Sequence, residues 1–166
     1  MKLGRLIRHL LATQWSTRRR FTPKVLADIE ATISQVESQH AGEIRFVVET
    51  ALHPHDLWHD LAPRQRALQA FAQLGVWDTE HNNGVLIYVL LADRAVEILA
   101  DRGLAARVAQ LEWDQICRET ERHYRGGDFG AGSVAGIQHV GRLLGLHFPG
   151  GPKRHANELP NQPVLL

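Results

Sequence analysis

The alternation of apolar and polar positions is clearest in the middle of the chain, between Asn82 and Leu104. Val85 to Leu91 is one uninterrupted apolar run, and a run of that length is typical of a strand covered on both faces. A short link follows, and Ala95 to Ala100 then places Val96 and Ile98 on the side opposite Glu97. That period of two indicates a second strand nearer the edge of a sheet. The two segments predict a β-hairpin at the centre of the fold.

Helical patterns with start and stop signals flank this hairpin. Thr22-Pro23 predicts the beginning of a helix, because Thr can cap it and Pro suits its first turn. The segment Glu43 to Thr50 predicts a further strand, and a helix beginning at Pro63 separates it from the hairpin. Helical patterns continue from Leu104 to Leu146. This order predicts an α/β fold, a three-layer α/β/α sandwich with a small mixed sheet.

The first residues form an amphipathic helix followed by a basic run. Between residues 2 and 14, leucines and Ile7 share one stripe, and basic side chains fall opposite. Three interpretations stay open: a helix that lies on anionic lipid or a membrane partner, a helix docked on its own domain with a solvated basic face, and a nucleic-acid patch. Nucleic acid is the weakest of these, because the rest of the chain is acidic. The predicted membrane- or partner-binding residues are Lys2, Arg5, Arg8, Trp15, Arg18, Arg19 and Arg20.

Charge is distributed unevenly along the 166 residues. The first 24 residues carry seven of the 19 Lys and Arg and none of the 18 acids, although the net charge is only +1. This split predicts a basic arm on an acidic body. We expect residues 1–20 to form the basic N-terminal helix, residues 21–148 the α/β domain, and residues 149–166, rich in Gly, Pro and polar side chains, a flexible tail.

Composition indicates the compartment. The single cysteine, Cys117, has no partner for an internal disulfide, which fits a reducing environment. The longest apolar run is too short to span a bilayer, and arginines interrupt the N-terminal leucines where a signal peptide would need an apolar core. A cytoplasmic protein, peripheral at the inner membrane, is the expectation.

Several carboxylates follow the predicted strands or begin the later helices. Asp93 and Asp101 mark the two ends of the second hairpin strand, and we expect a site beside them. Oxygen ligands of this kind suit a hard divalent cation, calcium or magnesium. The predicted metal ligands are Asp78, Asp93, Asp101, Glu112 and Asp128.

Four segments in order resemble the TPM domain family over about residues 22–146. They are GEIRFVVE, NNGVLIYVLLADR, the pattern Ile98…Gly103-Leu104, and R-x-G-D-x-x-x-G from Arg125 to Gly132. The resemblance implies a three-layer α/β/α sandwich. It also implies divalent cation binding in some members, acid phosphatase activity in some plant members, and bacterial relatives encoded near LemA-type membrane proteins.

No nucleophile with an activating group is recognisable in the sequence. Cys117 and Arg118 do not form a Cys-x5-Arg loop, and there is no Asp-x-Asp or phosphate-binding Gly loop. The favoured hypothesis is therefore a non-catalytic accessory module that acts at an anionic membrane surface or on a LemA-type membrane protein. The alternative is a metal-assisted acid phosphatase, in which a cation held by the carboxylates polarises a phosphate.

Overall fold

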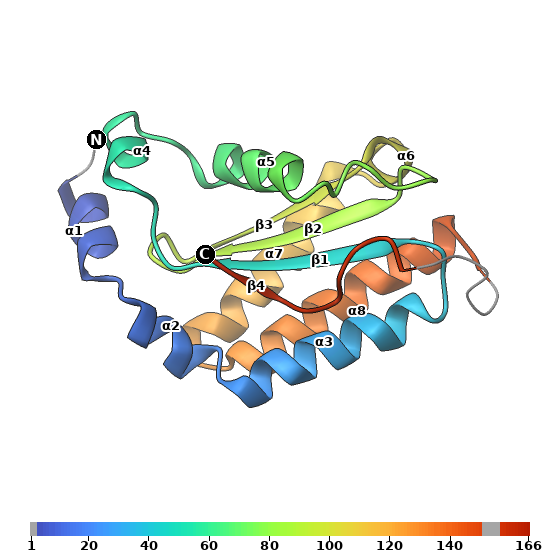
Figure 1. Cartoon of the computed structure of the whole chain (residues 1–166), viewed down its shortest axis with the longest axis horizontal. Helices are drawn as coiled ribbons and strands as arrows, with labels where there is room; N and C mark the ends of the chain where they lie inside the picture. Colours follow the sequence, from blue (N-terminus) through green and yellow to red (C-terminus); the bar gives the residue numbers. More distant parts are fainter. Residues whose placement is uncertain (1–2, 151–156) are drawn as a thin grey trace.

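Four strands form one mixed sheet in the computed structural model, which describes residues 3–150 and 157–166. β1 (Glu43–Glu49) and β2 (Gly84–Leu90) run parallel, and β3 (Ala95–Ala100) runs antiparallel to β2. The order is β3-β2-β1-β4 (Figure 1). All seven residues of β2 are buried, whereas β3 lies at an edge. The predicted central hairpin and the edge position of its second strand are confirmed.

Helices cover both faces of this sheet. α5 (Pro63–Gln73) packs on one face, against β2 and β3. α3 (Pro23–Glu37), α7 (Gln110–Arg125) and α8 (Phe129–His147) cover the other face (Figure 1). The predicted three-layer α/β/α sandwich with a small mixed sheet is therefore confirmed. Four shorter helices complete the described residues: α1 (Leu3–Leu11), α2 (Gln14–Arg20), α4 (Pro54–Trp58) and α6 (Arg102–Ala105).

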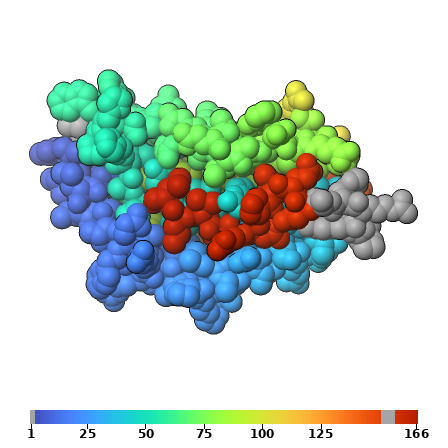
Figure 2. All heavy atoms as spheres, in the orientation of Figure 1, coloured from blue at the N-terminus to red at the C-terminus, as the bar shows by residue number. Residues whose placement is uncertain are grey.

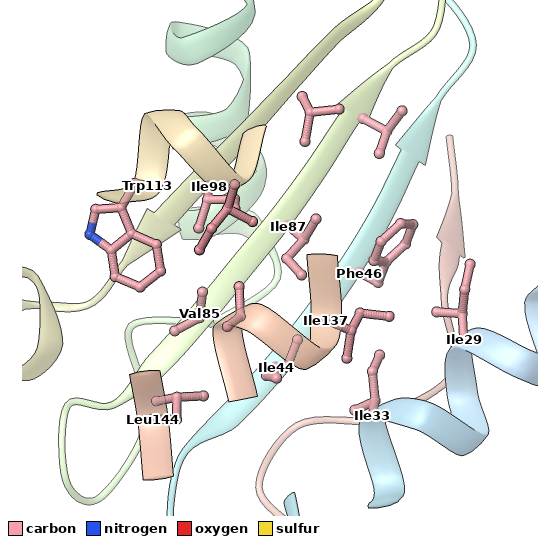
Figure 3. Packing of buried hydrophobic residues seen from close by; sticks show 14 of the residues in the cluster. Ile29, Ile33, Ile44, Phe46, Val85, Ile87, Ile98, Trp113, Ile137 and Leu144 are labelled. Atoms are coloured by element: carbon pink, nitrogen blue, oxygen red, sulfur yellow. The ribbon is translucent and has the colours of Figure 1, made fainter. Parts of the chain in front are cut away.

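The period of two along each strand divides the apolar side chains between two cores. Ile44, Phe46 and Val48 of β1 face α3 and α8, where Ile33 and Ile137 meet them (Figure 3). The intervening Val47 joins Leu86 and Tyr88 in the second core under α5. β2 and β3 also contribute side chains to both cores. A shift of strand register by one residue would therefore move these side chains from one core to the other.

Glycines let α8 approach its neighbours closely. A Cβ on Gly136 would lie 2.9 Å from Thr120 Oγ1 of α7, and one on Gly141 would lie 2.8 Å from Val36 Cβ of α3. A larger residue at either position would therefore force α8 away from α7 or α3. Thr22 also caps α3 as predicted, since its Oγ1 accepts a hydrogen bond from Val25 N at 3.3 Å.

The C-terminal segment departs from the prediction of a flexible tail. β4 (Val164–Leu165) pairs in parallel with β1, and Leu159 is only 5% exposed. Arg45 also donates to the carbonyl oxygens of Pro160 and Gln162. Figure 2 shows this segment, in red, running along the visible face between the blue N-terminal part and the green middle of the chain. The tail prediction is wrong for residues 157–166, because the outer edge of β1 is open and a short apolar strand completes it.

Two helices replace the single helix predicted for residues 1–20. α1 ends at Leu11, and Thr13 caps α2 by accepting from Ser16 N at 3.2 Å. The basic run Arg18-Arg19-Arg20 is thus the last turn of a helix. Along residues 3–150 and 157–166, no helix combines the length and apolarity needed to cross a bilayer.

Candidate functional site

The carboxyl ends of β1 and β2 meet at one edge of the sheet, since the two strands are parallel. Open α/β sheets bind their ligands outside this edge. Glu49 ends β1 here and Thr50 follows it, while Asp93 lies in the turn that follows β2. α1 and α2 lie at this end of the sheet (Figure 1). The basic N-terminal segment, which forms α1 and α2, therefore covers the end of the sheet where a ligand site is expected.

Asp93 is the centre of a polar cluster that anchors α1. Arg5 Nη2 lies 2.8 Å from Asp93 Oδ2, and Arg5 Nε lies 3.1 and 3.0 Å from the two carboxylate oxygens. His9 Nε2 lies 3.0 Å from Asp93 Oδ1. Burial favours a higher pKa for Asp93, but hydrogen bonds and charge from Arg5 and His9 outweigh it and hold the pKa below its usual value. The carboxylate is therefore ionised at neutral pH and is paired with Arg5.

Further contacts extend this anchor along both N-terminal helices. His9 Nδ1 accepts a hydrogen bond from Leu52 N at 3.0 Å, so the imidazole bridges the loop after β1 and the turn after β2. Arg8 Nε donates to Ala92 O at 3.2 Å. The hydroxyls of Thr17 in α2 and Thr50 lie 2.8 Å apart and are buried. The docked interpretation of the N-terminal helix is correct.

The orientation of the docked α1 is the reverse of the expected one. The basic face was expected in solvent, but Arg5 and His9 face the domain, and His9 is 4% exposed. Leu6 alone of the apolar stripe packs against the second core. The remaining apolar side chains of α1 point away from the protein, and we call them the apolar face of α1: Leu3, Ile7, Leu10 and Leu11, exposed by 70%, 47%, 64% and 73%.

α2 continues with exposed aromatic and basic side chains. Trp15 is 66% exposed, and Arg19 stacks over its ring with Cζ 4.7 Å from the centroid. Arg18 and Arg20 are also exposed. Two of the residues predicted to bind a membrane or a partner make contacts within the protein instead. Arg5 binds Asp93, and Arg8, which is half exposed, donates to Ala92 O. Lys2 lies outside the described residues.

The structure does not bring the five predicted metal ligands together. Asp93 follows the pair Leu90↔Ala95 and Asp101 follows the pair Val85↔Ala100, so they lie at opposite ends of the hairpin. The expectation that both belong to one neighbourhood does not hold, because the second strand is fully extended between them. Among residues 3–150 and 157–166, no group of three or more His, Cys, Asp or Glu could hold a metal ion. Cation binding stays a prediction.

Each of these acids has its own surroundings. Asp101 Oδ1 accepts from Arg102 N at 2.7 Å at the start of α6, while its Oδ2 is buried without a hydrogen-bond partner in the described part of the chain. Asp128 precedes α8 at the capping position, but its side chain makes no capping hydrogen bond. Glu112 lies in the first turn of α7, and Asp78 lies in the loop after α5.

A buried network that the sequence did not predict lies under α5. Arg66 Nε donates to both oxygens of Glu49, at 3.1 and 2.9 Å, and Tyr88 OH donates to Glu49 Oε2 at 2.5 Å. Burial, with the hydrogen bond to the Glu49 carboxylate, raises the pKa of Tyr88. The network fixes α5 to β1 and β2. Glu49 and Tyr88 become neighbours only through strand pairing, so the sequence pattern contains no local signal for it.

The three layers define a small α/β/α domain. Its N-terminal helices, α1 and α2, are docked at the carboxyl ends of the parallel strands. The chain belongs to the TPM domain family, whose model matches residues 18–143. The resemblance expected over residues 22–146 is confirmed. Comparison with curated proteins gives no significant match.

Solved structures agree with this assignment. The chain is similar to the BA42 protein from the psychrophilic bacterium Bizionia argentinensis, with a TM-score of 0.75 and 30% identity over 87% of this chain and 94% of that one. The N-terminal domain of a P. gingivalis protein gives a TM-score of 0.55 and 22% identity, covering 75% of this chain and 76% of that one. The N-terminal domain of cg2496 from Corynebacterium glutamicum gives 0.55 and 15%, covering 81% and 80%. The latter two likenesses show the fold alone.

Proposed function

We propose that this TPM-domain protein is a non-catalytic accessory module that docks on an anionic membrane surface through α1 and α2. The observation that carries the proposal is the orientation of α1. Arg5 and His9 bind the domain, whereas the apolar face of α1 is left exposed. Contiguous exposed apolar side chains on a folded protein mark an interaction surface.

The neighbouring residues favour a lipid surface over an apolar protein groove. Trp15 is an amphipathic ring of the kind that lies at the level of lipid headgroups. Arg18 and Arg19 are exposed beside it, and each basic residue near an anionic bilayer contributes about 1 kcal/mol of binding free energy. α1 also lies at one end of the molecule, where a flat surface can reach it (Figure 1).

Liposome flotation tests this proposal. The wild-type protein is expected to float with vesicles that contain phosphatidylserine and to stay in the dense fraction with neutral vesicles. The triple variant Ile7→Gln, Leu10→Gln, Leu11→Gln should lose flotation, because it removes apolar area and leaves the contacts of Arg5 and His9 intact. The matched control is Leu111→Gln with Leu146→Gln, two exposed leucines on α7 and α8.

Other outcomes identify other partners. Equal recovery with anionic and neutral vesicles, or equal flotation of the triple variant and the control, contradicts a lipid surface. Recovery with native membranes but not with pure lipid indicates a membrane protein, such as one of the LemA type. A dimer in solution that the triple variant abolishes indicates that a second copy covers α1.

A further inference from the structure

An extended segment, residues 157–166, covers the outer edge of β1. Its strand β4 pairs in parallel with β1, Leu166 N donates to Val48 O at 2.9 Å, and Thr50 N donates to Leu166 O at 3.1 Å. Figure 2 shows this segment, in red, as a strip on the visible face of the protein. An uncovered strand edge presents N–H and C=O groups, and an extended peptide is a ligand that satisfies them. The outer edge of β1 therefore has the properties of a peptide-binding surface.

Two apolar side chains anchor this segment in the second core. Leu159 is 5% exposed and is part of that core, and the partly buried Val164 packs against it. The other side chains of residues 157–166 are exposed or half-buried. The surface therefore recognises two apolar anchors and the backbone between them, and it places little demand on the remaining side chains.

Arg45 of β1 binds the backbone between the two anchors. Its Nη1 donates to Pro160 O and, at 2.9 Å, to Gln162 O. Pro160 and Pro163 have no backbone N–H, so the stretch before Val164 cannot form a regular strand ladder with β1. The guanidinium group takes the place of a ladder here, because it supplies donors to carbonyl oxygens that a neighbouring strand would otherwise serve.

We propose that the outer edge of β1 binds an extended peptide of a partner protein, with the pattern Leu-Pro-x-x-Pro-Val-Leu, and that residues 157–166 occupy this site in cis. A partner peptide with the same two anchors makes the same contacts, since the strand pairs and the bonds from Arg45 involve only its backbone. The attached segment competes at an effective concentration on the order of millimolar, so a partner displaces it only when it is itself held close by. The site is separate from the apolar face of α1 and does not require membrane docking.

A full-length chain with a weakened cis segment tests the site. The probe is a synthetic peptide with the sequence of residues 157–166, added to the ¹⁵N-labelled Leu159→Ala chain. The amide signal of Thr50 should shift and saturate, with an affinity at least about tenfold higher than that of the wild-type chain, whose own leucine competes. Leu165→Ala, at a side chain that is 37% exposed, is the matched control and should bind the peptide as weakly as the wild type does.

The recognition of the peptide is tested from both sides. Arg45→Gln, added to the Leu159→Ala chain, should weaken binding about tenfold, the loss expected for a charged hydrogen-bond donor. Arg118→Gln in the same background is its control, because this arginine is exposed on α7, which covers the opposite face of the sheet. A peptide that carries Leu159→Ala itself should also bind at least about tenfold more weakly than the unmodified peptide.

Hydrogen exchange in the wild-type chain provides a measurement that does not depend on the stability of a variant. Excess peptide should speed the exchange of the Leu166 amide, because the cis segment is released from Val48 O. The Thr50 amide should stay protected, because the peptide supplies a new acceptor.

Three results overturn the proposal: equal affinity of the Leu159→Ala and Leu165→Ala chains, equal affinity of the two peptides, or unchanged exchange at Leu166 with excess peptide. A wild-type dimer that Leu159→Ala abolishes also overturns it, because a second copy would then supply the segment in place of a partner protein.

Discussion

Arg5 Nη2 lies 2.8 Å from Asp93 Oδ2, although 88 residues separate them along the chain. This contact joins the basic first helix to the turn after the central strand. It also decides which face of α1 meets solvent, since Arg5 and His9 both point to the same carboxylate. The exposed leucines are a consequence of this polar anchor.

Substituting Asp93 should release α1. Asp93→Asn removes the charge that Arg5 and His9 share and should lower the free energy of unfolding by about 1–3 kcal/mol at pH 7. Chemical denaturation measures this loss, and faster exchange of the Leu52 amide, which donates to His9, reports the release of α1 directly. Asp60→Asn is the control, because its carboxylate is exposed and lies 3.3 Å from the same Arg5. Equal effects of the two variants would show that Asp93 is not the anchor.

The contribution of Asp93 depends on pH with a defined sign. Its folded pKa is lowered from the usual 3.8, so the stabilisation is fully present above that value and is lost as pH falls through the folded pKa. The difference in stability between wild type and Asp93→Asn should therefore be constant near neutral pH and shrink below pH 3.8. Parallel urea titrations across this window measure it. A difference that grows as the pH falls would contradict the assignment.

The C-terminal segment should contribute to stability through Leu159. Leu159→Ala leaves a cavity in the second core and should cost about 2–4 kcal/mol. Leu165→Ala, at a side chain that is 37% exposed, should cost less than about 1 kcal/mol. A chain ending at residue 156 should also lose protection of the Thr50 amide, which donates to Leu166 O. Unchanged exchange at Thr50 would show that β4 does not pair with β1 in solution.

Two glycines of α8 should respond in opposite directions to Ala. Gly141→Ala brings a Cβ within 2.8 Å of Val36 Cβ and should destabilise the protein by about 1–3 kcal/mol, because α3 and α8 must move apart. Nothing lies within 4 Å of a Cβ on Gly145, so Gly145→Ala should stabilise by up to about 1 kcal/mol through helix propensity. Thermal melts of both variants measure the effects. A stable Gly141→Ala protein would mean that the helices are less closely packed than described.

The cation hypothesis has its sharpest test at Asp101. Its Oδ2 is buried without a hydrogen-bond partner among the described residues, and calcium binding there should raise the melting temperature by mass action. Asp101→Asn retains the capping oxygen of α6, so it should melt like the wild type without metal and lose the calcium response. If neither calcium nor magnesium changes the melting temperature of the wild-type protein, the cation site is ruled out. Most of the case for a metal-assisted phosphatase is then lost as well.

Local pattern alone predicted the layers of this protein. The unbroken apolar run from Val85 places β2 at the centre of the sheet, and the alternation after it places β3 at an edge. Thr22 and Pro23 mark the start of α3 in the same way. These signals are local, because burial on one or both faces and helix capping depend on neighbours within a few residues. The charge split predicted a basic arm in the first 24 residues, whereas α1 and α2 are docked on the domain.

Tertiary structure alone decided which side chains meet. Asp93 and Asp101 are close in the sequence, yet an extended strand carries them to opposite ends of the hairpin. Arg45 and Gln162 belong to segments whose distance in space depends on strand order. The sequence pattern could not predict the orientation of α1 either, because an amphipathic helix can bury either face. Here the carboxylate of Asp93, on a distant turn, binds the polar face of the helix. The hydrophobic period of a segment predicts its secondary structure. The elements against which that segment packs depend on the fold of the whole chain.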